Sequence, residues 1–462
     1  MASDGVVGGS FRDPSGVVFR RDGIVYRQVN AGSAADLDRL EASGLYRKLV
    51  GAGLLVAHQD AAVPPPDPIA ARRVIRPEQI PFISYPYEWC FGQLKDAALT
   101  TLEIQLRAVD DGMSLKDASA FNIQFLGGRP VLIDTLSFEK YVEGRPWVAY
   151  RQFCEHFLGP LVLMSRVDPW LGRLSALTVD GVPLEIASRL LPLTSRFNPT
   201  TLLHIHLHAR SVKKYGGRGV PERVKSRGLS RRGMRNLVEG LKHAVEKLTW
   251  SPVGTEWANY EMEHGYMDES LGAKREVVGD ALRAIHPRTV WDLGANTGEF
   301  SRLALDQGAF VVSMDFDPAA VEKNYRRMRQ DAETRLLPLV VDLRSPSSDL
   351  GWAEQERDGL TARSNPEVLM ALALIHHLVI GANVPISRIM QWFARLAPQV
   401  LIEFVPKDDP QVRRLLISRA DVFEDYSREA FERSMREWFQ IRSVHQLPGS
   451  SRAVFHGVRH GV

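Results

Sequence analysis

From about residue 250 onward, short apolar runs alternate with segments that carry apolar residues at helical spacing. The apolar runs predict buried strands, and they are TVWDL, AFVVSMDF, LLPLVVDL, VLMALALI and VLIEFV. Such strands, alternating with helices, are typical of a parallel sheet covered on both faces. The runs FQIRSVHQL and SRAVFHGVR flank a PGS turn at the end of the chain and predict a hairpin. We therefore expect a doubly wound, mostly parallel α/β domain with an antiparallel last strand over residues 255–462.

The first 200 residues have a different pattern, in which short apolar runs and turn signals mix. Two alternating runs around Asp22-Gly23 predict a hairpin, and residues 34–53 and 99–112 predict helices. Residues 121–138 predict two strands around a Gly127-Gly128 turn. We expect an accessory α+β domain over residues 1–200.

Between these domains, residues 201–254 form the predicted connector. Its stretch RSVKKYGGRGVPERVKSRGLSRRGMRN is rich in lysine, arginine and glycine. This composition predicts a basic, solvated linker with helical parts, and a phosphate-binding surface for nucleic acid or an anionic substrate is the alternative. The net charge of the whole chain is only +3, so nucleic acid is not the favoured partner.

Length and composition narrow the class of protein. A chain of 462 residues is too long for one ordinary core. No apolar run approaches the length of a membrane-spanning helix, and the N-terminus has no signal-peptide core. The two cysteines, Cys90 and Cys154, fit a reducing compartment and exclude a cysteine-built framework. We expect a cytoplasmic protein without membrane insertion, and the sequence gives no indication of its oligomeric state.

Polar residues and glycines follow four consecutive predicted strands. In an open parallel sheet, ligands bind beyond the carboxyl ends of the strands, so these residues are expected to meet around one ligand. A carboxylate after the second strand can accept hydrogen bonds from both ribose hydroxyls, and one after the third can accept from an adenine amine. The residues, in strand order, are Asp292, Gly294, Asn296 and Gly298; Asp315; Asp342; His376 and His377.

On these residues, the region from 255 to 460 resembles the class I S-adenosylmethionine-dependent methyltransferases, which have a seven-stranded sheet with an antiparallel final hairpin. VWDLGANTGEFS resembles the first motif of that family, SMDFDP the second, VVDL the third and ALALIHHL the fourth. The resemblance implies S-adenosylmethionine as cofactor and S-adenosylhomocysteine as product. It places Gly294 and Gly298 under the amino-acid portion, with Asp292 organising that loop. It also places Asp315 on the ribose, Phe316 against the adenine and Asp342 near the adenine amine, and makes Tyr266 and Lys274 candidate contacts from an upstream lid.

Methyl transfer from a sulfonium is an in-line displacement, and a hydroxyl acceptor needs a base. His376 stands where several oxygen methyltransferases resembling this chain keep such a base, and His377 is its neighbour; a structural role for either is the alternative. Glu403 could orient a base or bind substrate. We expect no metal site, and a hydroxyl of a small molecule or sugar as acceptor. The rival interpretation, a NAD-dependent Rossmann oxidoreductase, expects a glycine where Asn296 stands.

The segment LKDASAFNIQFLGGRPVLIDT poses a second question. Asp117 and Asn122 stand five apart, and Asp134 follows a glycine turn and an apolar strand. The spacing resembles the catalytic loop and metal-binding aspartate of protein kinases and small-molecule phosphotransferases. The sequence departs from that pattern, because DTL replaces the aspartate-phenylalanine-glycine triplet and Arg27 stands where a lysine is expected. Three interpretations stay open. The first is an ATP-dependent phosphotransferase, either alongside an active methyltransferase or with a second domain that only binds its cofactor. The second is a kinase-like module that recruits substrate, and the third is an unrelated accessory domain.

Overall fold

The computed structural model describes residues 4–215, 229–253, 268–363, 365–417 and 421–461. The chain forms two compact units. The N-terminal unit contains residues 2–251 and also 349–358, and the C-terminal unit contains residues 252–348 and 359–462. The short segment 349–358 is therefore flanked in sequence by residues of the C-terminal unit but packs within the N-terminal unit.

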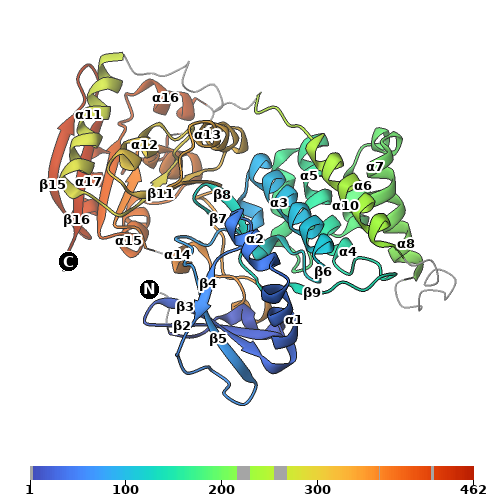
Figure 1. Ribbon diagram of the computed structural model, residues 1–462. Helices are drawn as coiled ribbons and strands as arrows, with labels where there is room; N and C mark the ends of the chain where they lie inside the picture. The colour runs from blue at the N-terminus through green and yellow to red at the C-terminus, as the bar shows by residue number, and fades with distance from the viewer. Residues whose placement is uncertain (1–3, 216–228, 254–267, 364, 418–420, 462) are drawn as a thin grey trace. The chain divides into compact units, whose positions relative to one another are not determined.

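The C-terminal unit is built on a seven-stranded sheet with the order β12-β11-β10-β13-β14-β16-β15 (Figure 1). The first five strands in this order pair in parallel, whereas β16 is antiparallel to both of its neighbours. This confirms the expected mostly parallel sheet and its terminal hairpin, and the strand order is that of the class I methyltransferase fold. The strands are β10 (Thr289–Leu293), β11 (Phe310–Asp315), β12 (Leu336–Val340), β13 (Val368–Ala371), β14 (Gln399–Phe404), β15 (Phe439–Gln446) and β16 (Ala453–Arg459).

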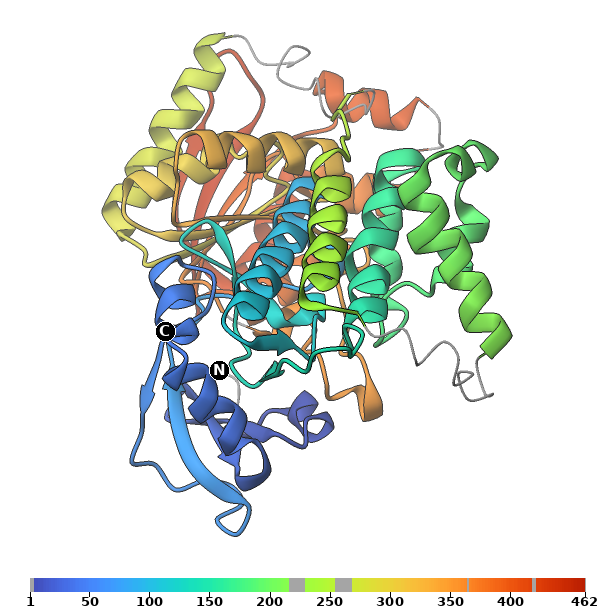
Figure 2. The ribbon, with the colours of Figure 1, turned by 45° about the vertical axis from the view of Figure 1, so that its right-hand side comes forward.

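Helices cover both faces of this sheet (Figure 2). Crossovers between parallel strands are right-handed. The chain moves in one direction from β10 to β12 and in the other from β13 to β14, so its crossover helices fall on opposite faces. The helices are α11 (Asp268–Ile285), α12 (Glu299–Asp306), α13 (Pro318–Gln330), α14 (Leu360–Arg363), α15 (Ile386–Leu396), α16 (Pro410–Leu416) and α17 (Arg428–Arg436).

The strand order reverses between β10 and β13, which is the place where an open α/β sheet binds its ligand. One expectation fails at this point. The apolar run VLMALALI predicted a strand over residues 368–375, but β13 ends at Ala371. Ala373 has a left-handed φ of 51°, so the chain turns away from the sheet. The remaining apolar residues of the run are thereby free to line a cavity.

The N-terminal unit begins with a five-stranded antiparallel sheet of order β1-β2-β3-β5-β4. The predicted hairpin is confirmed: β2 pairs with β3 around Asp22 and Gly23, which both have positive φ, as a two-residue hairpin turn requires. The single helix predicted over residues 34–53 is wrong, because Gly44, with a φ of 77°, separates two helices. These elements are β1 (Gly5–Val6), β2 (Gly16–Arg21), β3 (Ile24–Asn30), β4 (His58–Asp60), β5 (Ala71–Pro77), α1 (Ala31–Ala42) and α2 (Leu45–Gly51).

The rest of this unit is mainly helical and surrounds α3 (Phe91–Asp110), most of whose residues are buried. Two small ribbons pair β6 with β9 and β7 with β8 around the predicted Gly127-Gly128 turn. The described part of the predicted connector is helical, and α10 packs against α3. The other elements are β6 (Met113–Leu115), β7 (Ile123–Leu126), β8 (Arg129–Leu132), β9 (Phe138–Lys140), α4 (Tyr150–Phe153), α5 (Gly159–Arg166), α6 (Leu184–Leu190), α7 (Pro199–Thr201), α8 (His208–Tyr215) and α10 (Arg231–Glu246). Within the described ranges, no helix is long and apolar enough to cross a membrane.

Candidate functional site

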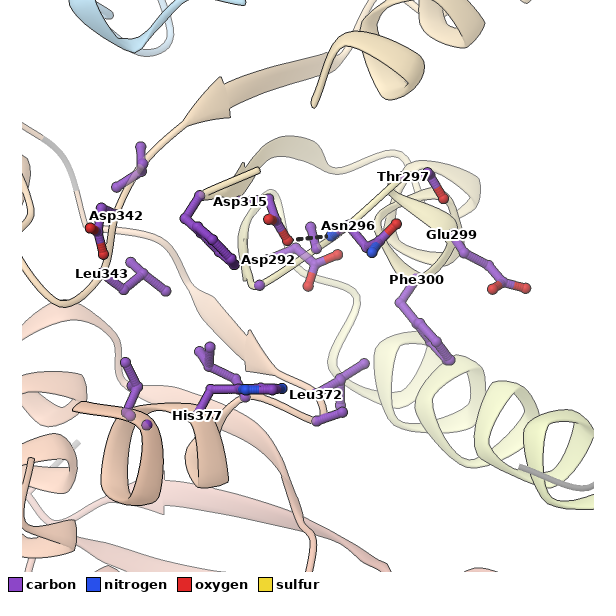
Figure 3. A pocket seen from close by; sticks show the side chains of 18 of the residues that line it. Asp292, Asn296, Thr297, Glu299, Phe300, Asp315, Asp342, Leu343, Leu372 and His377 are labelled. Atoms are coloured by element: carbon purple, nitrogen blue, oxygen red, sulfur yellow. Dashed lines mark hydrogen bonds between the residues drawn. The ribbon is translucent and has the colours of Figure 1, made fainter. Parts of the chain in front are cut away.

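A cavity of about 340 Å³ opens at the carboxyl ends of β10, β11, β12 and β13 (Figure 3). Each of these strands contributes the residues that directly follow it, as the sequence predicts. Of the predicted site residues, the cavity lining includes Lys274, Asp292, Gly294, Asn296, Asp315, Phe316, Asp342 and His377. Gly298, His376 and Glu403 lie outside this lining, and Tyr266 lies outside the described residues.

Asp292 and Asp315 are both buried at the floor of the cavity. Asp292 Oδ2 accepts a hydrogen bond from Ser301 Oγ (2.6 Å), and Asp315 Oδ2 accepts one from the backbone N–H of Asn296 (2.8 Å; Figure 3). Burial raises the pKa of each carboxyl to about 6, and the hydrogen bonds they accept oppose the rise. Both carboxylates are therefore charged at neutral pH and sensitive to mild acid.

The turn after β10 needs its glycines for two different reasons. Gly294 has a φ of 71° and lines the cavity, so the backbone can approach a ligand closely. Gly298 also has a positive φ, but a Cβ on it would lie 2.5 Å from Nδ2 of Asn324. Gly298 therefore allows the start of α12 to pack against α13.

Asp342 carries an ion pair in this structure. The guanidinium of Arg344 donates from Nε to Oδ1 (2.8 Å) and from a terminal nitrogen to Oδ2 (2.9 Å) of Asp342. The same guanidinium lies 5.5 Å from the ring centre of Phe316. Arg344 thus borders both side chains that the sequence assigned to the adenine, although no motif had singled it out.

A buried ionic chain stands behind one wall of the cavity. Lys274 Nζ lies 2.7 Å from Glu403 Oε2 and 4.3 Å from the ring centre of Phe300. Glu403 also lies 3.6 Å from Arg452, which binds Asp409 through two hydrogen bonds. Burial lowers the pKa of Lys274, and Glu403 opposes that change. Glu403 therefore contacts a residue of the lining, Lys274, while its own carboxylate is fully buried outside that lining.

The two neighbouring histidines differ in their access to the cavity. His377 lies across the cavity from Asp292 and Asp315 (Figure 3), whereas the His376 side chain is completely buried and outside the lining. Their ring centres are 4.1 Å apart. Burial lowers the pKa of His377 to about 4, and it lowers the pKa of His376 well below the usual range. Both rings are neutral at physiological pH, and His377 is the one that a bound substrate can reach.

The three residues with phosphotransferase spacing do come together in the N-terminal unit. Burial raises the pKa of Asp117, and the nearby Asp134 carboxylate adds to the rise. Nδ2 of Asn122 donates to Ser137 Oγ (3.4 Å), and that hydroxyl donates to Asp134 Oδ2 (2.7 Å). Asp134 also forms an ion pair with Arg27 at 2.8 Å. A guanidinium and a hydroxyl therefore hold the carboxylate that would bind magnesium.

No protein-family model matches this chain. The nodulation protein NoeA of Rhizobium meliloti (strain 1021) is 37% identical over 462 residues, covering 98% of this chain and 95% of that protein. Among solved structures, magnesium protoporphyrin IX methyltransferase from Synechocystis PCC 6803 with bound SAM is 16% identical, with a TM-score of 0.30, over 45% of this chain and 86% of the other. The N-methyltransferase NodS from Bradyrhizobium japonicum WM9 is 9% identical, with a TM-score of 0.31, over 42% and 97%. These TM-scores are too low to bear on function, and the fold assignment rests on the strand order.

Proposed function

The chain belongs to the family of the nodulation protein NoeA, and we propose that it is an S-adenosylmethionine-dependent methyltransferase. The observation that carries the proposal is the single cavity in which four consecutive strand ends present their acids, glycines and histidine. In the C-terminal sheet, the antiparallel β16 lies between β14 and β15. This arrangement favours a methyltransferase over a nicotinamide oxidoreductase, whose sheet has the parallel strand order 3-2-1-4-5-6.

The residues of the cavity suit the parts of this cofactor. We assign Asp315 to the ribose hydroxyls, and Phe316 and Asp342 to the adenine. The backbone at Gly294 and Asn296 faces the amino-acid portion, and Lys274 offers a cation to its carboxylate. When bound, the cofactor supplies a methyl group on a positively charged sulfur, and the carboxylates of Asp292 and Asp315 favour that charge.

We assign the role of base to His377 because it is neutral and reaches the cavity. Its ring nitrogen can take the proton of an acceptor hydroxyl as the bond from the acceptor oxygen to the methyl carbon forms and the bond from that carbon to sulfur breaks, with S-adenosylhomocysteine as the leaving group. Glu403 is assigned as a positioning residue that holds Lys274. The acceptor we propose is a hydroxyl of a sugar or another small molecule, and the nodulation relative supports a molecule connected with that process. Transfer of tritiated methyl into extracts of the source cell, followed by identification of the labelled product, tests this assignment.

We predict that acid weakens cofactor binding without slowing the chemical step. The pKa of Asp315 and of Asp292 is about 6, so both carboxylates become protonated as the pH falls from 7 to 5. The neutral carboxyl groups accept hydrogen bonds more weakly than the charged carboxylates do. His377, with a pKa of about 4, stays neutral over most of this range. The Kd for S-adenosylhomocysteine and the KM for the cofactor should therefore rise, while kcat stays nearly constant. A kcat that falls in parallel, at an unchanged Kd, would contradict these roles.

For the N-terminal unit, we propose a substrate-recruiting role in preference to phosphotransfer. The pairing of Arg27 with Asp134 is the observation that disfavours phosphotransfer, since magnesium would have to displace a guanidinium. We predict no magnesium-dependent heat when ATP is titrated into the full chain. Heat that appears in wild type and disappears in the Asp134→Ala variant would instead demonstrate an active phosphotransferase site.

A further inference from the structure

The segment of residues 349–358 lies in sequence between β12 and β13 of the C-terminal unit, but it packs within the N-terminal unit. We call this segment the arm. Leu350 and Arg357 form an isolated antiparallel bridge, which folds the arm back on itself. The arm is joined through the chain to β12 on one side and to β13 on the other.

The first anchor of the arm is an ion pair with the 3-10 turn Gly8–Arg12. A terminal nitrogen of Arg12 lies 2.6 Å from Glu356 Oε1, and only 4% of the Glu356 side chain is exposed. The backbones also come very close, because a Cβ on Gly8 would lie 1.7 Å from the carbonyl oxygen of Gln355. Any residue with a side chain at position 8 would therefore separate the arm from the turn.

The second anchor is Arg357, which is only 8% exposed. Its guanidinium carbon lies 3.8 Å from the ring centre of Phe121, whose ring also packs against Tyr85, Tyr87 and His156. A cation held against aromatic rings and away from water is a specific contact. Phe121 stands in the loop that carries Asp117 and Asn122, so the arm is seated on the phosphotransferase-like loop of the N-terminal unit.

At its other end, the arm continues directly into the wall of the proposed cofactor cavity. Asp342, Leu343 and Arg344 line that cavity. Three residues later, the carbonyl oxygen of Ser347 accepts a hydrogen bond from the N–H of Leu360 (2.9 Å), which closes the base of the excursion. Residues 345–348 therefore connect the adenine end of the cavity with the start of the arm, and the anchors Glu356 and Arg357 lie near the arm's far end.

We propose that seating of the arm on the N-terminal unit and binding of the cofactor at Asp342–Arg344 stabilise one another. This inference rests on the proposed function, because it takes the cavity as a cofactor site. The loop of residues 342–348 follows β12 at one end, and the seated arm restrains its other end, so less conformational freedom is lost when the adenine binds. By linkage, the bound cofactor favours the seated arm to the same extent. The N-terminal unit thereby acts as a positive effector of the methyltransferase unit.

The test is calorimetric titration of S-adenosylhomocysteine into the full chain and three variants. Arg357→Ala empties the aromatic cage, and Arg12→Ala breaks the ion pair from the N-terminal side, far from the cavity in sequence. Arg72→Ala, at an exposed position of β5, is the matched control. Arg357→Ala and Arg12→Ala should each raise the Kd for S-adenosylhomocysteine by about fivefold or more, which is the lower end of the affinity changes that coupled sites usually show. Arg72→Ala should leave this Kd unchanged.

Hydrogen exchange of the arm supplies the reciprocal measurement. S-adenosylhomocysteine should slow exchange of the backbone N–H groups of residues 349–358 in wild type. Equal Kd values for all four proteins, or exchange in the arm that the ligand does not alter, would overturn the inference alone. If wild type itself does not bind S-adenosylhomocysteine, the proposed function fails, and the inference falls with its premise.

Discussion

Replacement of Asp315 by alanine is expected to weaken S-adenosylhomocysteine binding by about 100-fold or more. The carboxylate is assigned to two ribose hydroxyls, and hydrogen bonds to a charged group contribute roughly 1.5–3 kcal/mol each. Loss of both removes about 3 kcal/mol at least, which is slightly more than two factors of ten in Kd. The same carboxylate also holds the N–H groups of Asn296 and Asp317, so its removal loosens the turn that approaches the ligand. Calorimetry measures the effect directly.

The control for this variant is Asp317→Asn, two residues away. Asp317 begins α13 by accepting from the N–H of Ala319 (2.8 Å), and it does not line the cavity. Asparagine caps a helix about as well as aspartate, so we expect binding within a factor of two or three of wild type. Near-wild-type affinity in Asp315→Ala would show that the ribose lies elsewhere.

Replacement of His377 by asparagine is expected to lower kcat by about 100-fold or more, since a positioned base contributes 10²- to 10⁴-fold. Binding of S-adenosylhomocysteine should change little, because the ring faces the cavity from the side opposite Asp315 (Figure 3). Methyl transfer to the labelled acceptor measures kcat, and calorimetry measures Kd.

Two further variants make this result specific. His445→Asn changes an exposed histidine of β15 and should leave both quantities unchanged. Glu403→Gln removes the charge that faces Lys274, so its effect should fall mainly on cofactor affinity and not on kcat. An undiminished kcat in His377→Asn would exclude it as the base, and a loss in Glu403→Gln confined to kcat would indicate that Glu403 acts on the acceptor.

Local pattern was sufficient to predict the C-terminal sheet. Continuous apolar strands have few other ways to be buried, and the turn at Asp22-Gly23 likewise determined its hairpin. The strand-end residues could be predicted as a group because parallel strands present their carboxyl ends at one edge. Asp292, Asp315 and Asp342 therefore meet around one cavity although up to 50 residues separate them.

The failures involve long-range packing. VLMALALI reads as one apolar strand, but the chain turns at Ala373, and of the two histidines that follow, His376 is buried while His377 lines the cavity. Arg452, which completes the ionic chain behind Lys274, comes from the terminal hairpin, and nothing in its neighbourhood indicates that partner. Arg344 could have been found, since it is a cation only two residues after Asp342 and so within reach of that carboxylate. The seating of the arm could not, because it depends on a contact between residues 12 and 356.

We propose above all that this cavity binds the adenosine portion of the cofactor and faces its charged sulfur. A crystal structure of the full chain grown with S-adenosylhomocysteine tests it most directly. We expect the ribose hydroxyls on the carboxylate of Asp315, the adenine beside Phe316 and Asp342, and the sulfur facing His377. A ligand bound elsewhere, or an adenosine held without Asp315 and Asp342, would contradict it.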